Sequence, residues 1–299
     1  MASFHWTTRR GFLAAGAGLL ISGNGISGAP LCALTSEQEE GPYYVDDEKL
    51  RADITEGKPG VPLQLRIAVV DSRTCAPLAN TALDIWHCDA SGVYSGFTAS
   101  SPDGPPGGGR GRGFDGPPPD GPPPDGPPPP DGPPPDFARG PGRGRGPGGG
   151  RGRGPLDATR FLRGVQISDP KGLAQFATIY PGWYSGRAVH IHVKAHIGSL
   201  TGHVGHTGQF FFPEDLTEKI AKLEPYAQRL NVHRTTQAED MVFTPQHGYE
   251  QMVAISRLGK SDTDGFLATV TLAIDPEATP APVGMGGRGR GGPPGRGPR

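Results

Sequence analysis

The sequence predicts an all-β protein, a two-layer β-sandwich with one short helix and a long disordered insertion. Short runs of alternating or continuous apolar residues recur along the chain and are bounded by Gly, Pro and Asp, as sandwich strands are. Only one stretch, 215–230, has the spacing of an amphipathic helix. About 200 residues remain once the leader and the low-complexity tracts are set aside, which is the size of one ordinary domain. These observations favour a single sandwich domain built from 34–101 and 156–283.

The first 33 residues are typical of an export signal. Arg9 and Arg10 precede a weakly apolar run that ends at Ile21, which is the arrangement of a twin-arginine signal. The run is too short to span a bilayer, because a spanning helix needs about 20 apolar residues. The alternative is an ordinary buried helix that happens to follow two arginines. Because this route carries folded, cofactor-loaded proteins, we expect a periplasmic or extracellular location and no membrane span in the mature form.

Three cysteines are too few for a disulfide scaffold, and their spacing is not that of a zinc site. Signal cleavage between Ala29 and Leu34 would remove Cys32 or leave it beside the new N-terminus. Cys75 and Cys88 would then be an even pair in an oxidising compartment, able to form a disulfide. The sequence leaves open whether these two are bridged.

The predicted strands succeed one another with little helix between them. The first two, 61–70 and 81–86, flank a short polar turn and are predicted to form a hairpin or meander. The last two, 251–257 and 265–274, are predicted to close the domain as a hairpin. Residues 202–208 are predicted to form a Gly-rich loop. The other predicted strands are 159–167, 173–179, 190–195 and 209–212.

Two low-complexity tracts account for most of the excess of glycine and proline. Residues 102–155 repeat Asp-Gly-Pro-Pro-Pro and then Arg-Gly, and residues 284–299 are rich in Gly and Arg. Such segments bury too little apolar surface to offset the entropy of ordering the chain, so both are predicted to be disordered. Arg-Gly tracts can bind RNA, but the lack of interleaved aromatic residues and the net charge of -1 favour a linker and a tail with no nucleic-acid partner.

A His-Ile-His motif is the centre of the functional prediction. His190 and His192 are two residues apart in a predicted strand, so both side chains should lie on the same face. Two adjacent imidazoles suit two neighbouring positions on a metal, whereas the alternative is a half-buried strand whose histidines only form hydrogen bonds. Tyr184 and Arg187, just ahead of the motif, would add a phenol and a fixed positive charge. This combination favours a metal site for an anionic substrate.

Tyr94 supplies a second phenol, because it follows a predicted strand and lies on a loop. Two phenols and two imidazoles provide two anionic oxygens and two neutral nitrogens once the phenols ionise. Free tyrosine titrates at about pH 10, so ionisation at neutral pH requires a strong Lewis acid. Phenolate oxygen with imidazole nitrogen suits ferric iron, whereas an Fe(II) site of the two-His-one-carboxylate type needs an acidic residue that this motif lacks.

These segments together resemble the intradiol ring-cleavage dioxygenases, the family of the catechol 1,2- and protocatechuate 3,4-dioxygenases. The matching motifs occur in the family order, extend over nearly all of the predicted domain and are specific in combination. The Gly/Pro/Arg insertion between Tyr94 and Phe161 sets this chain apart, and the export signal is similar to that of the secreted branch of the family. The motifs are EGPYYV (40–45), DIWHCDASGVYSG (84–96), FLRGVQ (161–166), YPGWYSGRAVHIH (180–192) and TGQFFFPED (207–215).

The resemblance implies a reaction in which both atoms of O2 are inserted between the two hydroxyl-bearing carbons of a catechol, giving a cis,cis-muconic acid. Tyr184 would leave the metal and take a substrate proton, and Arg187 would stabilise negative charge on the ring. Gln209 would lie near the same ring face. The metal would be non-haem Fe(III), and the implied ligands are Tyr94, Tyr184, His190 and His192.

Two functions of other classes stay open. One is a catalytically inactive β-sandwich binding module for aromatic or carbohydrate ligands, and the other is an interaction protein that makes its contacts through the Arg/Gly tracts. The complete set of predicted ligands, together with Arg187 and Gln209, favours the enzyme. The sequence does not predict which catechol is the substrate, nor the oligomeric state, for which a homodimer is one option.

The remaining aromatic and histidine residues are expected to have structural roles. His87 should form local hydrogen bonds, and His203 and His206 should be exposed in their Gly-rich loop, although a place at the pocket mouth is the alternative. Tyr43 and Tyr44 should pack in the core or at the rim of the site.

Overall fold

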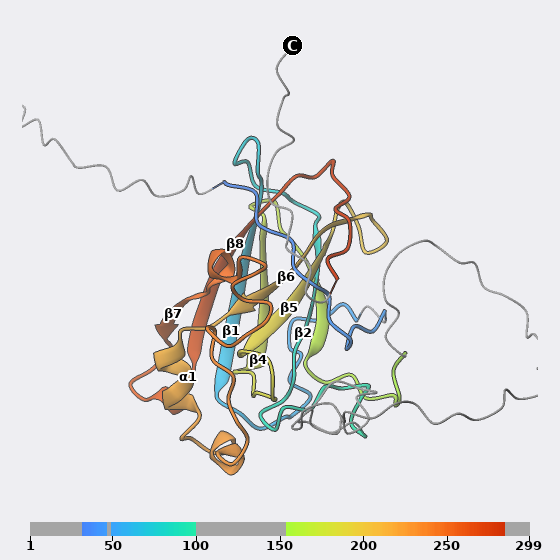
Figure 1. Ribbon diagram of the computed structural model, residues 1–299. Coiled ribbons are helices and arrows are strands. Elements are labelled where there is room, and N and C mark those ends of the chain that lie inside the picture. The colour runs from blue at the N-terminus through green and yellow to red at the C-terminus, as the bar shows by residue number, and fades with distance from the viewer. Residues whose placement is uncertain (1–31, 47–48, 100–153, 285–299) are drawn as a thin grey trace, which may run out of the picture. The chain divides into compact units, whose positions relative to one another are not determined.

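The computed structural model describes residues 32–46, 49–99 and 154–284 of the chain. These residues form two four-stranded sheets that pack face to face as two layers (Figure 1). One short α-helix accompanies them, so the predicted all-β, two-layer sandwich is confirmed. The predicted export signal, the insertion and the tail lie outside the described residues, apart from a few flanking positions.

The first sheet has the strand order β4-β1-β8-β7, and the second has the order β3-β2-β5-β6. Neighbouring strands are antiparallel except for β1 and β8, which are parallel. The strands of the first sheet are β1 (Pro62–Asp71), β4 (Leu173–Ile179), β7 (Ala254–Arg257) and β8 (Phe266–Ile274). The strands of the second sheet are β2 (Ala82–Trp86), β3 (Arg163–Ile167), β5 (His190–His196) and β6 (Val204–Phe211).

The two sheets differ in how much of each strand is buried. Leu63, Leu65 and Ile67 of β1 enter the core while the residues between them are exposed, which is the alternation of a sheet with one solvated face. Strands β2 and β5 are buried along their whole length, so their outer face is covered as well. The N-terminal segment 32–45 provides part of this cover and is hydrogen-bonded to β6 by the N–H of Gln38. The second sheet can therefore hold polar side chains away from water on its outer face.

Strands β1 and β2 do not form the predicted hairpin or meander, because they belong to different sheets. The carboxylate of Asp71 accepts hydrogen bonds from the N–H groups of Arg73 and Thr74 at 2.7 and 3.3 Å, which closes a turn at the end of β1. The N–H of Leu78 then returns to the carbonyl of Val69 before the chain crosses to the other layer. Apolar alternation predicts both strands but not the layer that each one joins. The predicted closing hairpin of β7 and β8 is confirmed.

Among the described residues the α-helix is α1, which spans Glu214–Ile220 and is shorter than the predicted stretch 215–230. A separate 3-10 helix follows at Tyr226–Arg229. Pro225 lies between the two helices and has no N–H to continue the helical hydrogen bonds. The spacing of apolar residues continues past this break, which explains why the pattern predicts a longer helix.

The predicted loop 202–208 is wrong, because β6 already begins at Val204. A Cβ atom on Gly205 would lie 2.7 Å from the side chain of Ile197, so this position is a glycine because another side chain packs closely against the strand. Glycine at such a position looks like a loop signal in the sequence while the backbone continues as a strand.

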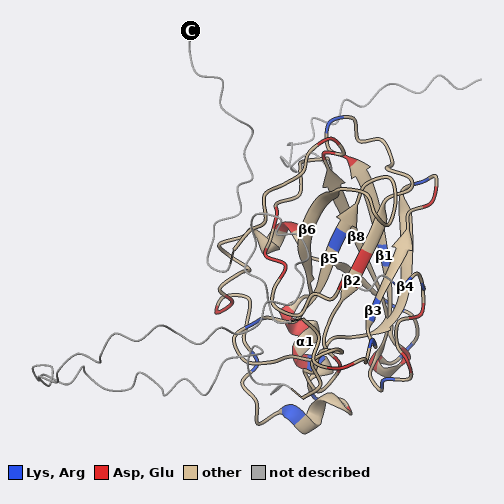
Figure 2. Cartoon of the chain, turned by 90° about the vertical axis from the view of Figure 1, so that its right-hand side faces the viewer, with Lys and Arg blue, Asp and Glu red and all other residues tan. Residues whose placement is uncertain are grey.

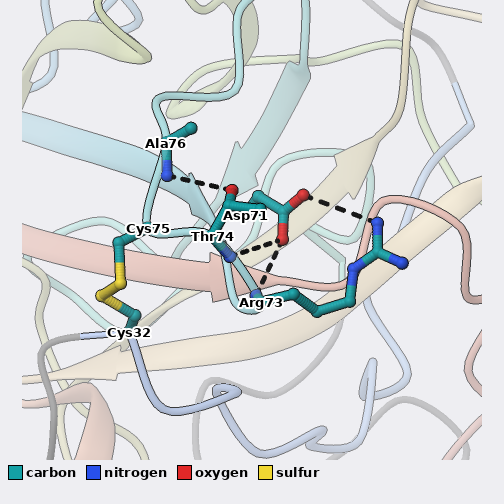
Figure 3. Close-up of a disulfide and its surroundings, with 6 residues drawn as sticks. All are labelled: Cys32, Asp71, Arg73, Thr74, Cys75 and Ala76. Atoms are coloured by element: carbon teal, nitrogen blue, oxygen red, sulfur yellow. Dashed lines mark hydrogen bonds and ion pairs between the residues drawn. A yellow bond between two sulfur atoms is a disulfide. The ribbon is translucent and has the colours of Figure 1, made fainter.

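Cys32 and Cys75 form a disulfide with their Cα atoms 5.3 Å apart (Figure 3). Cys88 is free and buried, so a bridge between Cys75 and Cys88 is excluded. The reason is positional: Cys75 belongs to the turn after β1, whereas Cys88 packs in an apolar cluster with Trp86 and Tyr94 on the second sheet. The disulfide ties the start of segment 32–45 to the turn closed by Asp71.

Among the described residues, no helix has both the length and the apolar character needed to cross a bilayer. Figure 2 shows charged residues mainly in loops and turns, with an acidic position on β2 beside a basic one on β5. At these positions Asp84 and Lys194 are partners in the strand register. Lys194 lies 3.4 Å above the ring of Tyr44 and forms an ion pair with Glu40 of segment 32–45. These contacts hold the N-terminal segment against the outer face of the second sheet.

Candidate metal centre

The His-Ile-His motif occupies the start of β5, where strand alternation places both imidazoles on one face. Ile191 is fully buried in the core between the sheets, so His190 and His192 lie on the opposite, outer face of the second sheet. Their Nε2 atoms are 3.0 Å apart. The structure thus brings the two predicted histidine ligands side by side.

Tyr94 and Tyr184 approach the same point from two separate segments. Oη of Tyr94 lies 3.4 Å from Nε2 of His190, and Oη of Tyr184 lies 3.3 Å from the same atom. The loop before Tyr94 is ordered by Asp89, whose carboxylate accepts hydrogen bonds from the residues that follow it. Tyr184 begins a tight turn in which Gly186 has a φ of +93°, a conformation that glycine adopts without strain. Three potential donor atoms therefore converge on a fourth, Nε2 of His190.

The protonation state of the histidines follows from their neighbours. Nδ1 of His190 lies 2.6 Å from the carbonyl oxygen of Ala188, which can only accept, so Nδ1 carries the proton and Nε2 keeps a lone pair. Burial and then the nearby charge of Arg187 lower the pKa of His190 to about 3. Burial and then the neighbouring His190 hold the pKa of His192 well below its ordinary value. Both imidazoles are neutral at pH 7, which is the form that binds metals.

Burial shifts the pKa of the two phenols upward, opposite to its effect on the imidazoles. Burial raises the pKa of Tyr94 and of Tyr184 well above that of free tyrosine. Without a cation both hydroxyls stay protonated at neutral pH. A highly charged metal ion in contact with the two oxygens would reverse this shift, because it stabilises the phenolate form.

The donor set fits ferric iron better than zinc or Fe(II). Within the described ranges, no three His, Cys, Asp or Glu side chains come together as a metal site, so a metal here would require the two phenol oxygens. Two anionic oxygens and two neutral nitrogens are the hard ligands that suit Fe(III). His190 is oriented by its hydrogen bond to a carbonyl, while His192 is oriented by stacking on Trp86 at 4.8 Å between ring centres.

Arg187 lies beside the four donors and is held by three buried side chains. Its Nε is 3.1 Å from a carboxylate oxygen of Asp240, and a second nitrogen donates a hydrogen bond to the side-chain carbonyl of Gln209. A third nitrogen is 3.6 Å from the carboxylate of Glu39. Gln209 also donates to the backbone carbonyl of Glu39 at 2.9 Å, so the two predicted catalytic residues Arg187 and Gln209 belong to one network.

Asp240 and Glu39 are functional residues that the motif analysis did not identify. Asp240 is 53 positions away from Arg187 in the sequence and lies in a segment without strand or helix, where no motif marks it. Glu39 directly precedes the EGPYYV motif, and this position is the one feature of the sequence that could have pointed to Glu39. Both carboxylates are buried, and their ion pairs with Arg187 offset the free-energy cost of burying their charge.

The N-terminal segment 32–45 covers the face that carries the histidines. The ring of Tyr43 stacks on that of Tyr94 with centroids 4.2 Å apart, and Tyr44 packs against Trp86, in agreement with the predicted core or rim positions. Gly41 has a φ of +74°, and a Cβ atom there would lie 3.0 Å from Cε1 of His192. The EGPYYV motif therefore contributes one wall of the site.

The structure also tests the predictions for His87, His203 and His206. His87 donates to the next backbone carbonyl and accepts from the hydroxyl of Thr178, both at 2.8 Å, so its predicted local role is confirmed. His203 is exposed, as predicted. His206 is buried within β6 and hydrogen-bonded to Glu37 at 2.9 Å, so its predicted exposure in a loop is wrong.

Comparison with solved structures identifies dioxygenases of one type. An intradiol ring-cleavage dioxygenase from Tetranychus urticae is 29% identical, with a TM-score of 0.62 over 83% of this chain and 98% of that chain. A second dioxygenase structure gives 29% identity and a TM-score of 0.61 over the same shares. No protein-family model matches the chain, and no curated protein matches it. In its motifs, its sandwich and these structural neighbours, the chain resembles the intradiol ring-cleavage dioxygenases.

Proposed function

We propose that this protein is a non-haem Fe(III) intradiol dioxygenase that inserts both atoms of O2 between the two hydroxyl-bearing carbons of a catechol to give a cis,cis-muconic acid. The observation that carries the proposal is the convergence of Tyr94, Tyr184 and His192 on Nε2 of His190. The reaction class of the structural neighbours supports it. A catalytically inactive binding module has no use for four metal donors in one buried cluster.

The iron would be held by the two phenol oxygens and the two Nε2 atoms described above. Bound there, Fe(III) would supply the Lewis acidity that draws electron density from a catecholate and makes its ring reactive toward O2. The protein supplies two neutral imidazoles whose nitrogens are already adjacent. It also keeps the site away from bulk water through segment 32–45, which strengthens every charge interaction inside.

Two side chains, Tyr184 and Arg187, would act on the substrate, and Gln209 would hold Arg187 in place. Burial raises the pKa of Tyr184, so its phenolate, once away from a cation, would take a proton from an incoming catechol and become a neutral phenol. Arg187 provides a fixed positive charge that can stabilise negative charge developing on the ring. Gln209 is opposite His192 in the strand register and holds Arg187 through its side-chain carbonyl.

A visible absorption spectrum of the iron-loaded protein tests the proposal, recorded before and after anaerobic addition of catechol. We expect a broad band from charge transfer between tyrosinate and Fe(III), and a shift of this band to longer wavelength when catechol binds. A protein that binds one equivalent of iron and stays colourless would overturn the ligand set. Formation of cis,cis-muconate in air, followed at its ultraviolet absorption, tests the reaction itself.

We also propose that the protein is exported and works outside the cytoplasm. The Arg9-Arg10 signal supports this location, and so does the Cys32–Cys75 disulfide, because disulfides persist in oxidising compartments. If the protein is exported and keeps the Cys32–Cys75 disulfide, signal cleavage must leave Cys32 in the mature chain. Mass spectrometry of protein recovered from the periplasm or medium should show an N-terminus before Cys32 and an oxidised Cys32–Cys75 pair. A mature chain that begins after Cys32 would contradict this.

A further inference from the structure

Asp240 accepts hydrogen bonds from backbone N–H groups around the site in addition to its ion pair with Arg187. One carboxylate oxygen is 3.1 Å from Nε of Arg187, and the other accepts the N–H of Ala188 at 2.7 Å. The N–H of Val242 donates to the first oxygen at 2.6 Å and fixes the carboxylate from its own side. The side chain of Asp240 is completely shielded from solvent. The carboxylate is thus fixed in place, and it binds two consecutive residues, Arg187 and Ala188.

Ala188 connects Asp240 to one of the proposed metal ligands. Its N–H donates to Asp240, and its carbonyl accepts the Nδ1–H of His190 at 2.6 Å. That hydrogen bond decides which nitrogen of His190 carries the proton and how the ring is turned. The orientation of the ring therefore depends on the position of the Ala188 backbone, and Asp240 fixes that backbone.

We propose that Asp240 is a positioning residue that fixes the guanidinium of Arg187 and, through the backbone of Ala188, the ring of His190 relative to each other. Asp240 does not reach substrate or metal, because Arg187 and Ala188 take up its hydrogen bonds toward the site. The inference rests on the proposed function, since the geometry that Asp240 maintains is that of the proposed substrate charge and metal ligand. In this proposal one buried carboxylate sets the position of the Arg187 guanidinium relative to the His190 ring.

Glu39 does not perform the same task. Its carboxylate lies 3.6 Å from the guanidinium of Arg187, beyond hydrogen-bond distance, and the N–H of Ala188 donates to Asp240 instead. One of its carboxylate oxygens is buried without a hydrogen-bond partner among the described residues. Glu39 balances charge, whereas Asp240 fixes geometry.

The replacement Asp240→Asn tests the inference, because it keeps the shape of the side chain while turning one acceptor oxygen into an NH2 donor. That donor cannot accept from Ala188 or from Arg187. We expect turnover to fall by about 10- to 100-fold, as for other residues that orient metal-bound histidines. The KM for catechol should change much less than kcat, and one equivalent of iron should still bind.

A second readout does not depend on activity. In the metal-free protein, NMR should show His190 with its proton on Nδ1 and a slowly exchanging Nε–H of Arg187. In Asp240→Asn we expect a mixture of His190 tautomers and faster exchange of the Arg187 proton. An unchanged tautomer and unchanged exchange would overturn the inference, even if the wild-type protein proved to have no dioxygenase activity. Absence of activity in the wild type would instead count against the proposed function alone.

Asp71→Asn is the matched control, because Asp71 is also a buried aspartate that accepts backbone N–H groups and pairs with an arginine (Figure 3). It lies at the β1 turn, and we expect its replacement to lower stability without changing kcat or the His190 tautomer. Should Asp240→Asn fail to fold, Asp240→Glu keeps the charge for Arg187 but displaces the oxygen that meets Ala188. Wild-type kcat and tautomer in Asp240→Glu would overturn the inference as well.

Discussion

Replacing Tyr184 with Phe is expected to lower turnover of catechol by about 10²- to 10⁴-fold, the range for loss of a group that transfers a proton. The ring of Tyr184 packs against Tyr43 and Tyr94, and Phe preserves those contacts. The lost hydroxyl lies 3.3 Å from Nε2 of His190, and a hydrogen bond of this kind is worth about 1 kcal/mol to folding. We therefore expect a large loss of activity with a nearly unchanged free energy of unfolding, measured by steady-state kinetics and urea denaturation.

Tyr180→Phe provides the comparison for this prediction. Tyr180 is also fully buried, and its hydroxyl is 2.7 Å from that of Thr217, away from the four converging donors. Its replacement should cost a similar free energy of unfolding and leave turnover unchanged. Wild-type turnover in Tyr184→Phe with iron still bound would remove Tyr184 from the mechanism.

The strands of the sandwich could be predicted from the sequence because alternation of apolar residues is a local property. Leu63 to Val69 in β1 is a clear example, since every second side chain enters the core. The layer that a strand joins is not local, which is why β1 and β2 were predicted as partners although the turn closed by Asp71 leads to the other sheet. The pairing of Cys32 with Cys75 was missed for a related reason, because it depends on where segment 32–45 begins in space.

The four converging side chains could be predicted because each belongs to a compact motif. The spacing of His190 and His192 fixes their shared face on β5 by geometry alone. Asp240 could not be found this way, since it reaches Arg187 from a segment with no regular structure and no recognisable pattern. The residues proposed to contact the metal or the substrate are thus visible in short motifs, whereas Asp240, which is proposed to position them, comes from elsewhere in the chain.

Replacing Arg187 with Met is expected to lower the free energy of unfolding by about 3–5 kcal/mol at neutral pH, because it leaves two buried carboxylates without their shared cation. Asp240 and Glu39 both contact the guanidinium and are almost completely buried. Turnover should fall as well, since the charge proposed to stabilise the ring is lost. Denaturation at several pH values would measure the stability of the variant and of the wild type.

The pH dependence of this loss has a definite sign. Burial raises the pKa of Glu39 above its ordinary value of 4.5, and the charge of Arg187 opposes that shift. A carboxyl whose pKa is raised by folding stabilises the folded state below its unfolded pKa, and this contribution is lost as pH rises through the folded pKa. Without Arg187 the pKa of Glu39 rises further, so the deficit of the variant should grow as the pH rises above the ordinary pKa of 4.5.

Arg73→Met tests whether the loss of stability in Arg187→Met comes from the burial of its carboxylate partners or only from the removal of a positive charge. Arg73 also has acidic partners, Asp71, Asp275 and Glu277, but about half of its side chain is exposed, with a relative accessibility of 51%. Water and salt screen such a network, so its loss should have little effect on stability at any pH. A deficit in Arg187→Met that is as small as that of Arg73→Met, or that does not change with pH, would show that Glu39 and Asp240 do not depend on Arg187 for their burial. A large deficit confined to Arg187→Met would mean that the same ion pairs that prepare the site for an anionic substrate also stabilise the second sheet.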